Sequence, residues 1–223
     1  MHKDTETTSK QAWYIDPTKT ALIVTDMQRA CLDEDAPLTF VAAKKMVPLI
    51  NDLASMCRRL RIPVVWLRQV NRSDLSDVGL LQAMRPRQLD SDMELLEGRK
   101  GADLSPQLIV MPDDYVIAKI RYSAFICGSS NLEPLLRGLG RDSLITCGVA
   151  TDVCVGTTVA DAMMLGFKVF VVGDLTATLT EERQRIALEV LDKCFAKVVT
   201  FNEVQVELRK LLGVLSSQSD SAT

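Results

Sequence analysis

Short apolar runs rich in β-branched residues set the fold class of this chain. Five of them are clear, at 20–26, 62–69, 114–119, 142–148 and 167–174. Helical patterns separate them, at 39–61, 129–140, 152–166 and 180–195. Runs that are apolar throughout are typical of strands buried on both faces, and their alternation with helices produces right-handed β-α-β units. We therefore predict an α/β fold: a single-domain, three-layer sandwich around a doubly wound, Rossmann-like parallel sheet of about six strands.

The segment 70–114 interrupts this alternation because its pattern is weak. We expect a long excursion there with one helix near 76–84. Long loops in compact domains are often functional lids. At the other end, 196–213 reads as a short strand followed by a helix. The predicted domain is 13–213, and the polar ends 1–12 and 214–223 are expected to be flexible tails.

The charge distribution and hydropathy argue against nucleic-acid binding and against a membrane span. The formal net charge is −3, from 26 basic and 29 acidic residues, without a clustered basic stripe, so no nucleic-acid binding is expected. No apolar run approaches the ~20 residues of a membrane span. The polar N-terminus carries no signal-peptide pattern, and the six cysteines include no C-x-x-C. We expect a cytoplasmic protein with free thiols that acts on a small molecule.

Histidine is nearly absent, which removes several kinds of active site. The one histidine of the chain is His2, in the predicted N-terminal tail. Histidine-based metal sites and mechanisms of the Ser-His-Asp or Cys-His kind are therefore not expected. We predict no metal and no cofactor. A nucleophile in this chain has to be activated by a carboxylate, a lysine or the backbone.

Three reactive side chains stand where apolar strands end. Asp26 ends the first run, Lys119 the third, and Cys154 opens the helix after the fourth. Each has an ordinary explanation by itself: a turn or cap residue, a solvated edge lysine and a small core residue. Ligands of such sheets bind beyond the carboxyl ends of the strands, so we expect the three to converge there. Together they would form a nucleophile, a base and an electrostatic partner.

This trio predicts acyl-transfer chemistry without histidine. Lys119 and the helix N-terminus are expected to lower the pKa of Cys154. Asp26 would accept the thiol proton and later deliver it to a leaving amine. The thiolate would attack a carbonyl, backbone N–H groups would stabilise the oxyanion, and water would then cleave the thioester.

Four segments, in this order, resemble the isochorismatase-like family of cysteine hydrolases: "ALIVTDMQ", "KIRYSAF", "GVATDVCVGTTVADAMMLGF" and "GDLTAT". The resemblance covers about 13–205 and implies the strand order 3-2-1-4-5-6. It places Asp26, Lys119 and Cys154 on the family's catalytic residues. It also implies an oxyanion hole from the backbone amides of Ala150 and Cys154, a cis peptide between Val149 and Ala150, and a homodimer or homotetramer.

Departures from the family's patterns bear on the substrate. Nicotinamidases of this family resemble one another in a metal site with histidines after the second strand. Here that region reads "WLRQVNRSDLSD", so metal-dependent nicotinamide hydrolysis is not expected. The isochorismatases often lack the cysteine, so Cys154 favours amide or ureido substrates, although "KIRYSAF" also resembles isochorismatases. Cys31 stands near the family's usual aromatic position.

Further candidates for substrate contacts lie close to the trio; they are Gln28, Arg121, Tyr122, Phe125 and Thr151. Arg121 binds either a substrate carboxylate or a structural one, and we prefer the structural reading. Phe125 is either core or pocket wall. Gln28 bonds either a substrate amide or the backbone of the turn at Asp26. Asp152 is expected to cap the helix that follows.

The predicted function is a cysteine-dependent amidohydrolase that releases ammonia or an amine from a small amide or ureido compound through a thioester. The alternative is an isochorismate vinyl-ether hydrolase with Asp26 as general acid and Cys154 as a bystander. A binding module that has lost its chemistry and a thiol redox sensor are two further hypotheses. The sequence does not fix the substrate, because much of the pocket lining is expected from the weakly patterned excursion.

Overall fold

A computed structural model describes residues 13–34, 36, 38, 40–85 and 91–220 of the chain. Its centre is one open sheet of six parallel strands in the order β3-β2-β1-β4-β5-β6. Their bounds are β1 (Thr20–Thr25), β2 (Val64–Gln69), β3 (Tyr115–Lys119), β4 (Ser143–Val149), β5 (Lys168–Ala177) and β6 (Lys197–Val199). The fold class and the strand order predicted from the sequence are confirmed.

Helices connect the strands and cover both faces of the sheet. They are α2 (Arg29–Leu32), α3 (Val41–Arg59), α4 (Leu81–Met84), α5 (Leu132–Gly138), α6 (Gly156–Met164), α7 (Glu181–Cys194) and α8 (Phe201–Asp220), with short helical turns η1 (Lys100–Ala102) and η2 (Thr151–Val155). None of the helices in the described part of the chain is long and apolar enough to cross a membrane.

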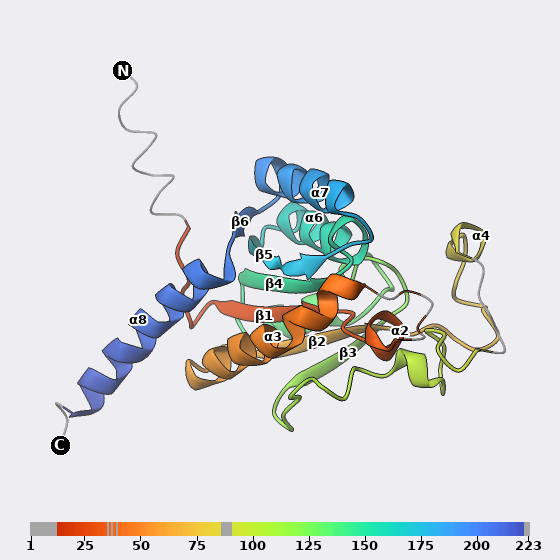
Figure 1. The fold of residues 1–223 in the computed structure, drawn as a ribbon. Helices are drawn as coiled ribbons and strands as arrows, with labels where there is room; N and C mark the ends of the chain where they lie inside the picture. Colours follow the sequence, from red (N-terminus) through yellow and green to blue (C-terminus); the bar gives the residue numbers. More distant parts are fainter. Residues whose placement is uncertain (1–12, 35, 37, 39, 86–90, 221–223) are drawn as a thin grey trace.

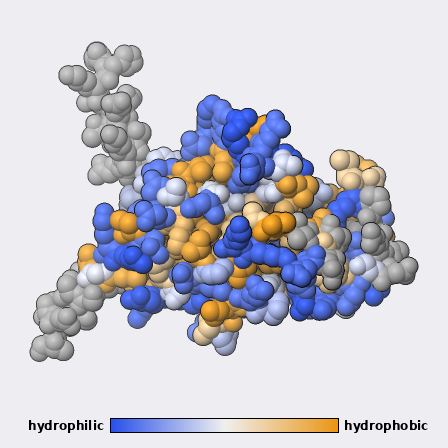
Figure 2. All heavy atoms as spheres, in the orientation of Figure 1, coloured by the Kyte–Doolittle hydropathy of each residue, from blue (hydrophilic) through white to orange (hydrophobic). Residues whose placement is uncertain are grey.

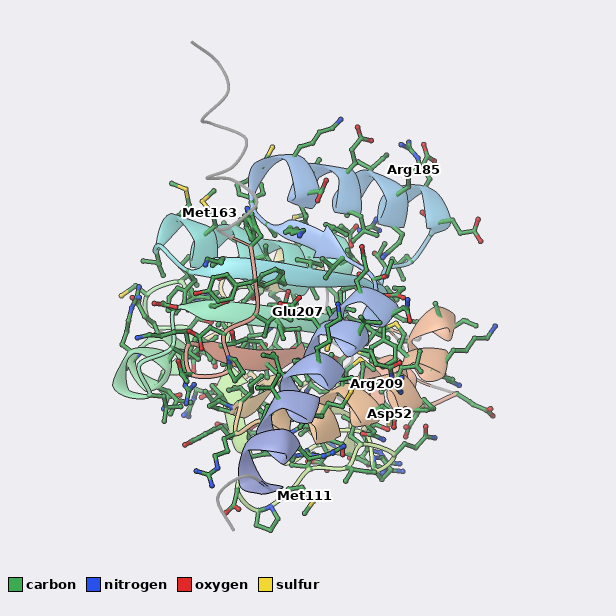
Figure 3. The ribbon with its side chains drawn as sticks, turned by 90° about the vertical axis from the view of Figure 1, so that its left-hand side faces the viewer. Asp52, Met111, Met163, Arg185, Glu207 and Arg209 are labelled. Carbon is green, nitrogen blue, oxygen red and sulfur yellow. The ribbon has the colours of Figure 1, made fainter. Side chains whose placement is uncertain are left out.

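Two apolar cores hold the layers together, one on each face. One core joins Leu22 and Val24 of β1 to α3 and α8, and the other joins Ile23 of β1 to α5, α6 and α7. Figure 1 shows α3 and α8 on one side of the sheet and α6 and α7 on the other. In Figure 3, α8 crosses in front of the sheet, with Glu207 labelled in its N-terminal half. The Glu207 carboxylate accepts from the Ile15 N–H at 2.6 Å. Alternate side chains of β1 therefore serve opposite cores, as in a strand buried on both faces.

Several element boundaries differ from the sequence prediction. The helix expected near 76–84 is reduced to the single turn α4, which buries none of its residues. Among the described residues of the excursion there is one further helical turn, η1. At the C-terminus α8 continues past Gly213 to Asp220, where a flexible tail is the sequence expectation. The predicted tail 1–12 lies outside the described residues.

The start of the helix after β4 also differs from the prediction. The chain first forms η2, a turn of π-helix, and only then α6. Ala150 is the N-cap residue of η2, so the prediction that Asp152 caps this helix is wrong. Asp152 instead accepts from Nε of Arg183 at 2.6 Å and from the Thr178 hydroxyl. The side chain that local sequence assigns to a cap thus ties η2 to the loop before α7.

The carboxyl ends of β1 and β4 approach closely, and a glycine makes this possible. Gly148 pairs with Thr25 in the register of the two strands and has φ +109°. A Cβ on Gly148 would lie 2.1 Å from the Thr25 carbonyl oxygen. Asp26, the next residue after β1, adopts φ +51°, a conformation uncommon for residues other than glycine. The backbone is thus unusual on both adjacent strands at this edge.

We expect Gly148→Ala to destabilise the fold by about 3 kcal/mol or more, because its Cβ would displace the β1 backbone and its φ is unfavourable. Urea unfolding followed by circular dichroism measures the free energy of unfolding. Gly138→Ala is the matched control, since no atom lies within 4 Å of its Cβ. Equal stability of the two variants would contradict the close approach of the strands.

Candidate active site

Polar side chains from four neighbouring segments meet at the carboxyl edge of the sheet. Asp26 follows β1, Gln69 ends β2, Lys119 ends β3, and Cys154 lies in η2 after β4. Gln69 and Lys119 are register partners, and Thr25 pairs with both Leu67 and Gly148. The three predicted residues are therefore brought together by the strand order, from positions spread over most of the domain.

Asp26 and Lys119 form a buried ion pair at the centre of this cluster. Lys119 Nζ lies 2.7 Å from Asp26 Oδ2, and the two side chains are 0% and 6% exposed. Nζ also donates to the backbone carbonyl of Arg121 at 3.1 Å. Burial acts to lower the pKa of Lys119, but the charge of Asp26 opposes it, with smaller contributions from Cys154, and the pKa is raised. The lysine is therefore a fixed cation at neutral pH.

The Cys154 thiol lies against this pair. It is within hydrogen-bonding reach of both Asp26 and Lys119, and its Sγ contacts Gln69 Oε1 at 3.8 Å. Burial raises the pKa of Cys154 well above its ordinary value, and Lys119 opposes this shift while Asp26 adds to it. The prediction that the pKa of Cys154 is lowered is wrong for the free protein. Because the charge of Lys119 is already balanced by Asp26, the resting site contains a carboxylate, an ammonium group and a neutral thiol.

One carboxylate oxygen of the pair has no partner. Asp26 Oδ2 is bonded to Lys119, whereas the buried Oδ1 accepts no hydrogen bond from the described residues. An unsatisfied buried acceptor is costly and is retained where it has a use. Asp26 and Cys154 interact and line the same cavity. The cis peptide bond expected between Val149 and Ala150 is present.

The cluster opens into a cavity of about 160 Å³. Asp26, Gln69, Ala150 and Cys154 lie on its inner wall. The rest of the wall comes from α2 and the segment after it, from the long excursion, from the loop after β3, from the end of β4 and η2, and from the loop before α7 with the first turn of that helix. These residues are mostly apolar: Cys31, Leu38, Phe40, Leu81, Arg85, Leu95, Tyr122, Val149, Val153, Thr178, Leu179 and Arg183. The site is thus a concave, largely apolar pocket with a few polar groups at one end, which is the usual form of a small-molecule site.

Of the predicted substrate contacts, only Tyr122 lines this cavity. Gln28 is fully buried and bonds the backbone of Gln69 and of Ala102, so its role is structural, but its partner is not the predicted backbone of the turn at Asp26. Arg121 donates to the backbone carbonyls of Asp77 and Ile120, and among the described residues these backbone groups take the place of the structural carboxylate that we preferred.

The two remaining predicted contacts also belong to the interior. Phe125 is core, with its ring 5.2 Å from that of Phe167. Thr151 is buried, and its hydroxyl donates to Gln184 Oε1 at 2.6 Å. Neither side chain lines the cavity.

Sequence reasoning missed four polar residues of the described lining: Gln69, Arg85, Thr178 and Arg183. Gln69 could have been found by the rule that selected Asp26 and Lys119, because it too is a polar residue that ends an apolar strand. Arg85 and Arg183 gave no such signal, since arginines in a weakly patterned loop and in the first turn of a helix are common on surfaces. In the described residues, no group of three or more His, Cys, Asp or Glu side chains is arranged to hold a metal ion.

Comparison with protein families now identifies the chain. Residues 20–203 match the isochorismatase domain model. The chain belongs to the isochorismatase family. It is 32% identical to an isochorismatase of Bacillus subtilis over 197 residues, which is 86% of this chain and 59% of that protein. It is also 32% identical to a probable inactive nicotinamidase of Arabidopsis thaliana over 193 residues, 85% of this chain and 96% of that protein. The chain spans less than two thirds of the length of the Bacillus relative.

Solved structures support the same assignment for this isochorismatase-family chain. A cysteine hydrolase from Pseudomonas syringae pv. phaseolicola superimposes with a TM-score of 0.82 at 28% identity, covering 89% of this chain and 96% of that one. A pyrazinamidase from Pyrococcus horikoshii, solved in complex with zinc, gives 0.70 at 26% identity over 82% and 99%. The protein is accordingly a hydrolase of the isochorismatase-like kind.

We expect Lys119→Met to destabilise the protein by about 3–5 kcal/mol, because it leaves the Asp26 carboxylate buried without its counter-ion. The double variant Asp26→Asn, Lys119→Met removes both charges and should recover most of that loss. Urea unfolding of the wild type, both single variants and the double variant gives the coupling energy. A coupling energy below about 1 kcal/mol would contradict a tightly paired buried site.

The buried thiols away from the site predict a loss of stability at high pH. Burial raises the pKa of Cys57 from its ordinary 9.0 to about 12, with Arg58 opposing. Because the folded-state pKa is the higher one, the stabilisation is fully present below pH 9 and is lost as pH rises toward 12. Between these pH values the free energy of unfolding falls with pH, and Cys57→Ala should make this fall smaller by about 1.4 kcal/mol per pH unit. Unfolding titrations between pH 8 and 11 measure it, with the exposed Cys127→Ala as control; an unchanged slope in Cys57→Ala would refute the argument.

Proposed function

We propose that the protein is a cysteine-dependent amidohydrolase that cleaves a C–N bond of a small amide or ureido compound through a thioester. The observation that carries the proposal is the position of Cys154 on the wall of an apolar cavity, within reach of both Asp26 and Lys119. These three residues are proposed as nucleophile, general base and electrostatic partner. The family's amidase members, such as the pyrazinamidase of Pyrococcus horikoshii, are consistent with this chemistry.

In the first half-reaction the neutral thiol loses its proton only as it attacks. Asp26 Oδ1, the buried acceptor without a partner among the described residues, takes the proton as Sγ adds to the substrate carbonyl. Lys119 offsets the negative charge that passes between sulfur and carboxylate. The oxyanion is bound by the backbone N–H groups of Ala150 and Cys154, each donor contributing about 3 kcal/mol to transition-state stabilisation.

Loss of the amine completes the first half-reaction, and hydrolysis of the thioester in the second returns the site to its resting state. Asp26 gives its proton to the leaving nitrogen, and the C–N bond breaks to release ammonia or an amine and leave the acyl group on Cys154. A water molecule then takes the place of the amine. Asp26 accepts a proton from this water as the water oxygen attacks the thioester. It then gives that proton to the sulfur as the C–S bond breaks, which releases the acid product and restores the thiol. No step uses histidine.

The second candidate function is hydrolysis of the vinyl ether of isochorismate, favoured by relatives such as the isochorismatase of Bacillus subtilis. In that reaction Asp26 would act as a general acid and Cys154 would be dispensable. The two candidates therefore differ in their need for the Cys154 sulfur, which lies in contact with Gln69 at the inner end of the cavity.

We expect Cys154→Ser to lower ammonia release from its amide or ureido substrate at least about a thousandfold, because serine at this site has no equally acidic proton to give. An ammonia-release screen over small amides, ureido acids, nicotinamide and biuret identifies the substrate, and intact-mass spectrometry of a rapidly quenched reaction detects the thioester. Cys127→Ser, at an exposed position, is the matched control. Full ammonia release by Cys154→Ala would contradict the proposal. Isochorismate hydrolysis that Cys154→Ala retains, without ammonia release from the other compounds, would replace the proposal by the second candidate.

A further inference from the structure

Much of the cavity wall is apolar. Leu38, Phe40, Leu81, Leu95, Val153 and Leu179 come from separate segments and surround the space into which a substrate's acyl or N-substituent would extend. Apolar surface of this kind favours carbon-rich groups that leave water. The polar groups of the same lining are Asp26, Gln69, the Ala150 backbone, Tyr122, Thr178 and the two arginines Arg85 and Arg183.

The charges that line the cavity are already matched within the protein. The charged lining residues among those described are Asp26, Arg85 and Arg183. Asp26 is paired with Lys119 at 2.7 Å, and Arg85 lies 3.6 Å from the buried Glu94 carboxylate.

Asp152 provides the third counter-charge. It accepts from Nε of Arg183 at 2.6 Å, and its other oxygen accepts from the Thr178 hydroxyl. Each guanidinium group of the lining thus has a carboxylate of its own. A substrate carboxylate would have to compete with Glu94 or Asp152 for its counter-ion.

We propose that the substrate is an uncharged amide or urea whose carbon substituent is compact and apolar, and that anionic substrates are rejected. This inference rests on the proposed amidohydrolase function and specifies its substrate class. The reason is desolvation: a carboxylate placed among the leucine and phenylalanine side chains would lose its water without gaining an uncompensated cation from the described residues of the lining. An isopropyl group of nearly the same shape loses no such hydration.

Isosteric substrate pairs test the proposal, since a carboxylate and an isopropyl group have similar shapes. The amide pair is 3-methylbutanamide and malonamate, and the ureido pair is N-isobutylurea and N-carbamoylglycine. The readout is kcat/KM for ammonia release, with Cys154→Ser as blank. We expect the isopropyl member to be hydrolysed at least a hundredfold faster in at least one pair, and the carboxylate member to be the poorer substrate in both.

A variant that adds an unmatched cation provides the second arm. Leu179 lines the cavity and is 60% exposed, so Leu179→Arg adds a guanidinium group at the rim without emptying the core. We expect it to shift the ratio of kcat/KM values toward the carboxylate member by at least tenfold. Met164→Arg is the matched control, because Met164 is 75% exposed at the far end of α6 and lies outside the cavity lining; it should leave the ratio unchanged.

The outcomes separate this inference from the function on which it rests. Cys154-dependent hydrolysis that favours malonamate or N-carbamoylglycine in the wild type overturns the uncharged substrate and leaves the amidohydrolase standing. Absence of Cys154-dependent ammonia release from both pairs and from the wider screen overturns both. A preference for the isopropyl members that Leu179→Arg shifts and Met164→Arg does not supports the charge-matching argument.

Discussion

The buried ion pair between Asp26 and Lys119 is the interaction on which the site depends. Neither side chain is tolerable alone in a region with almost no solvent, because an unpaired buried charge is strongly destabilising. The pair also joins the ends of β1 and β3, which are separated in the sheet by β2. It therefore fixes the distance between strands and, at the same time, leaves Asp26 Oδ1 as an acceptor without a partner among the described residues.

The state of Cys154 follows from that pair. A lysine beside a thiol normally favours the thiolate, but here the ammonium charge is balanced by Asp26 and burial dominates. In the proposed mechanism the sulfur stays protonated until a substrate carbonyl is present. Nucleophile and base would then exchange one proton inside a site whose net charge does not change, so that little reorganisation of charge would be needed during the reaction.

The segments that form the pocket differ in how deeply they are buried. Its inner end rests on strand ends and on η2, whereas its outer wall includes α4, which buries none of its residues. In Figure 2 the exposed side chains of α4 form a pale orange projection at the right-hand edge of the molecule. Leu80 and Met84 in and beside this turn are 85% and 80% exposed. The proposed chemistry would thus take place at the sheet edge, and part of the cavity wall lies on the long excursion.

The sequence by itself determined the sheet and the identity of the central residues. Apolar β-branched runs specify buried strands, and polar residues at their carboxyl ends meet at one edge whatever lies between them, which is why Asp26, Lys119 and Cys154 could be predicted to converge. Only the tertiary structure decided the rest. Gln28, Thr151 and Phe125 stand beside the motifs in sequence but their side chains bond or pack inward, while Arg85 and Arg183 reach the cavity from distant segments. The pKa of Cys154 likewise depends on burial and on charges far apart in the chain, which local sequence does not encode.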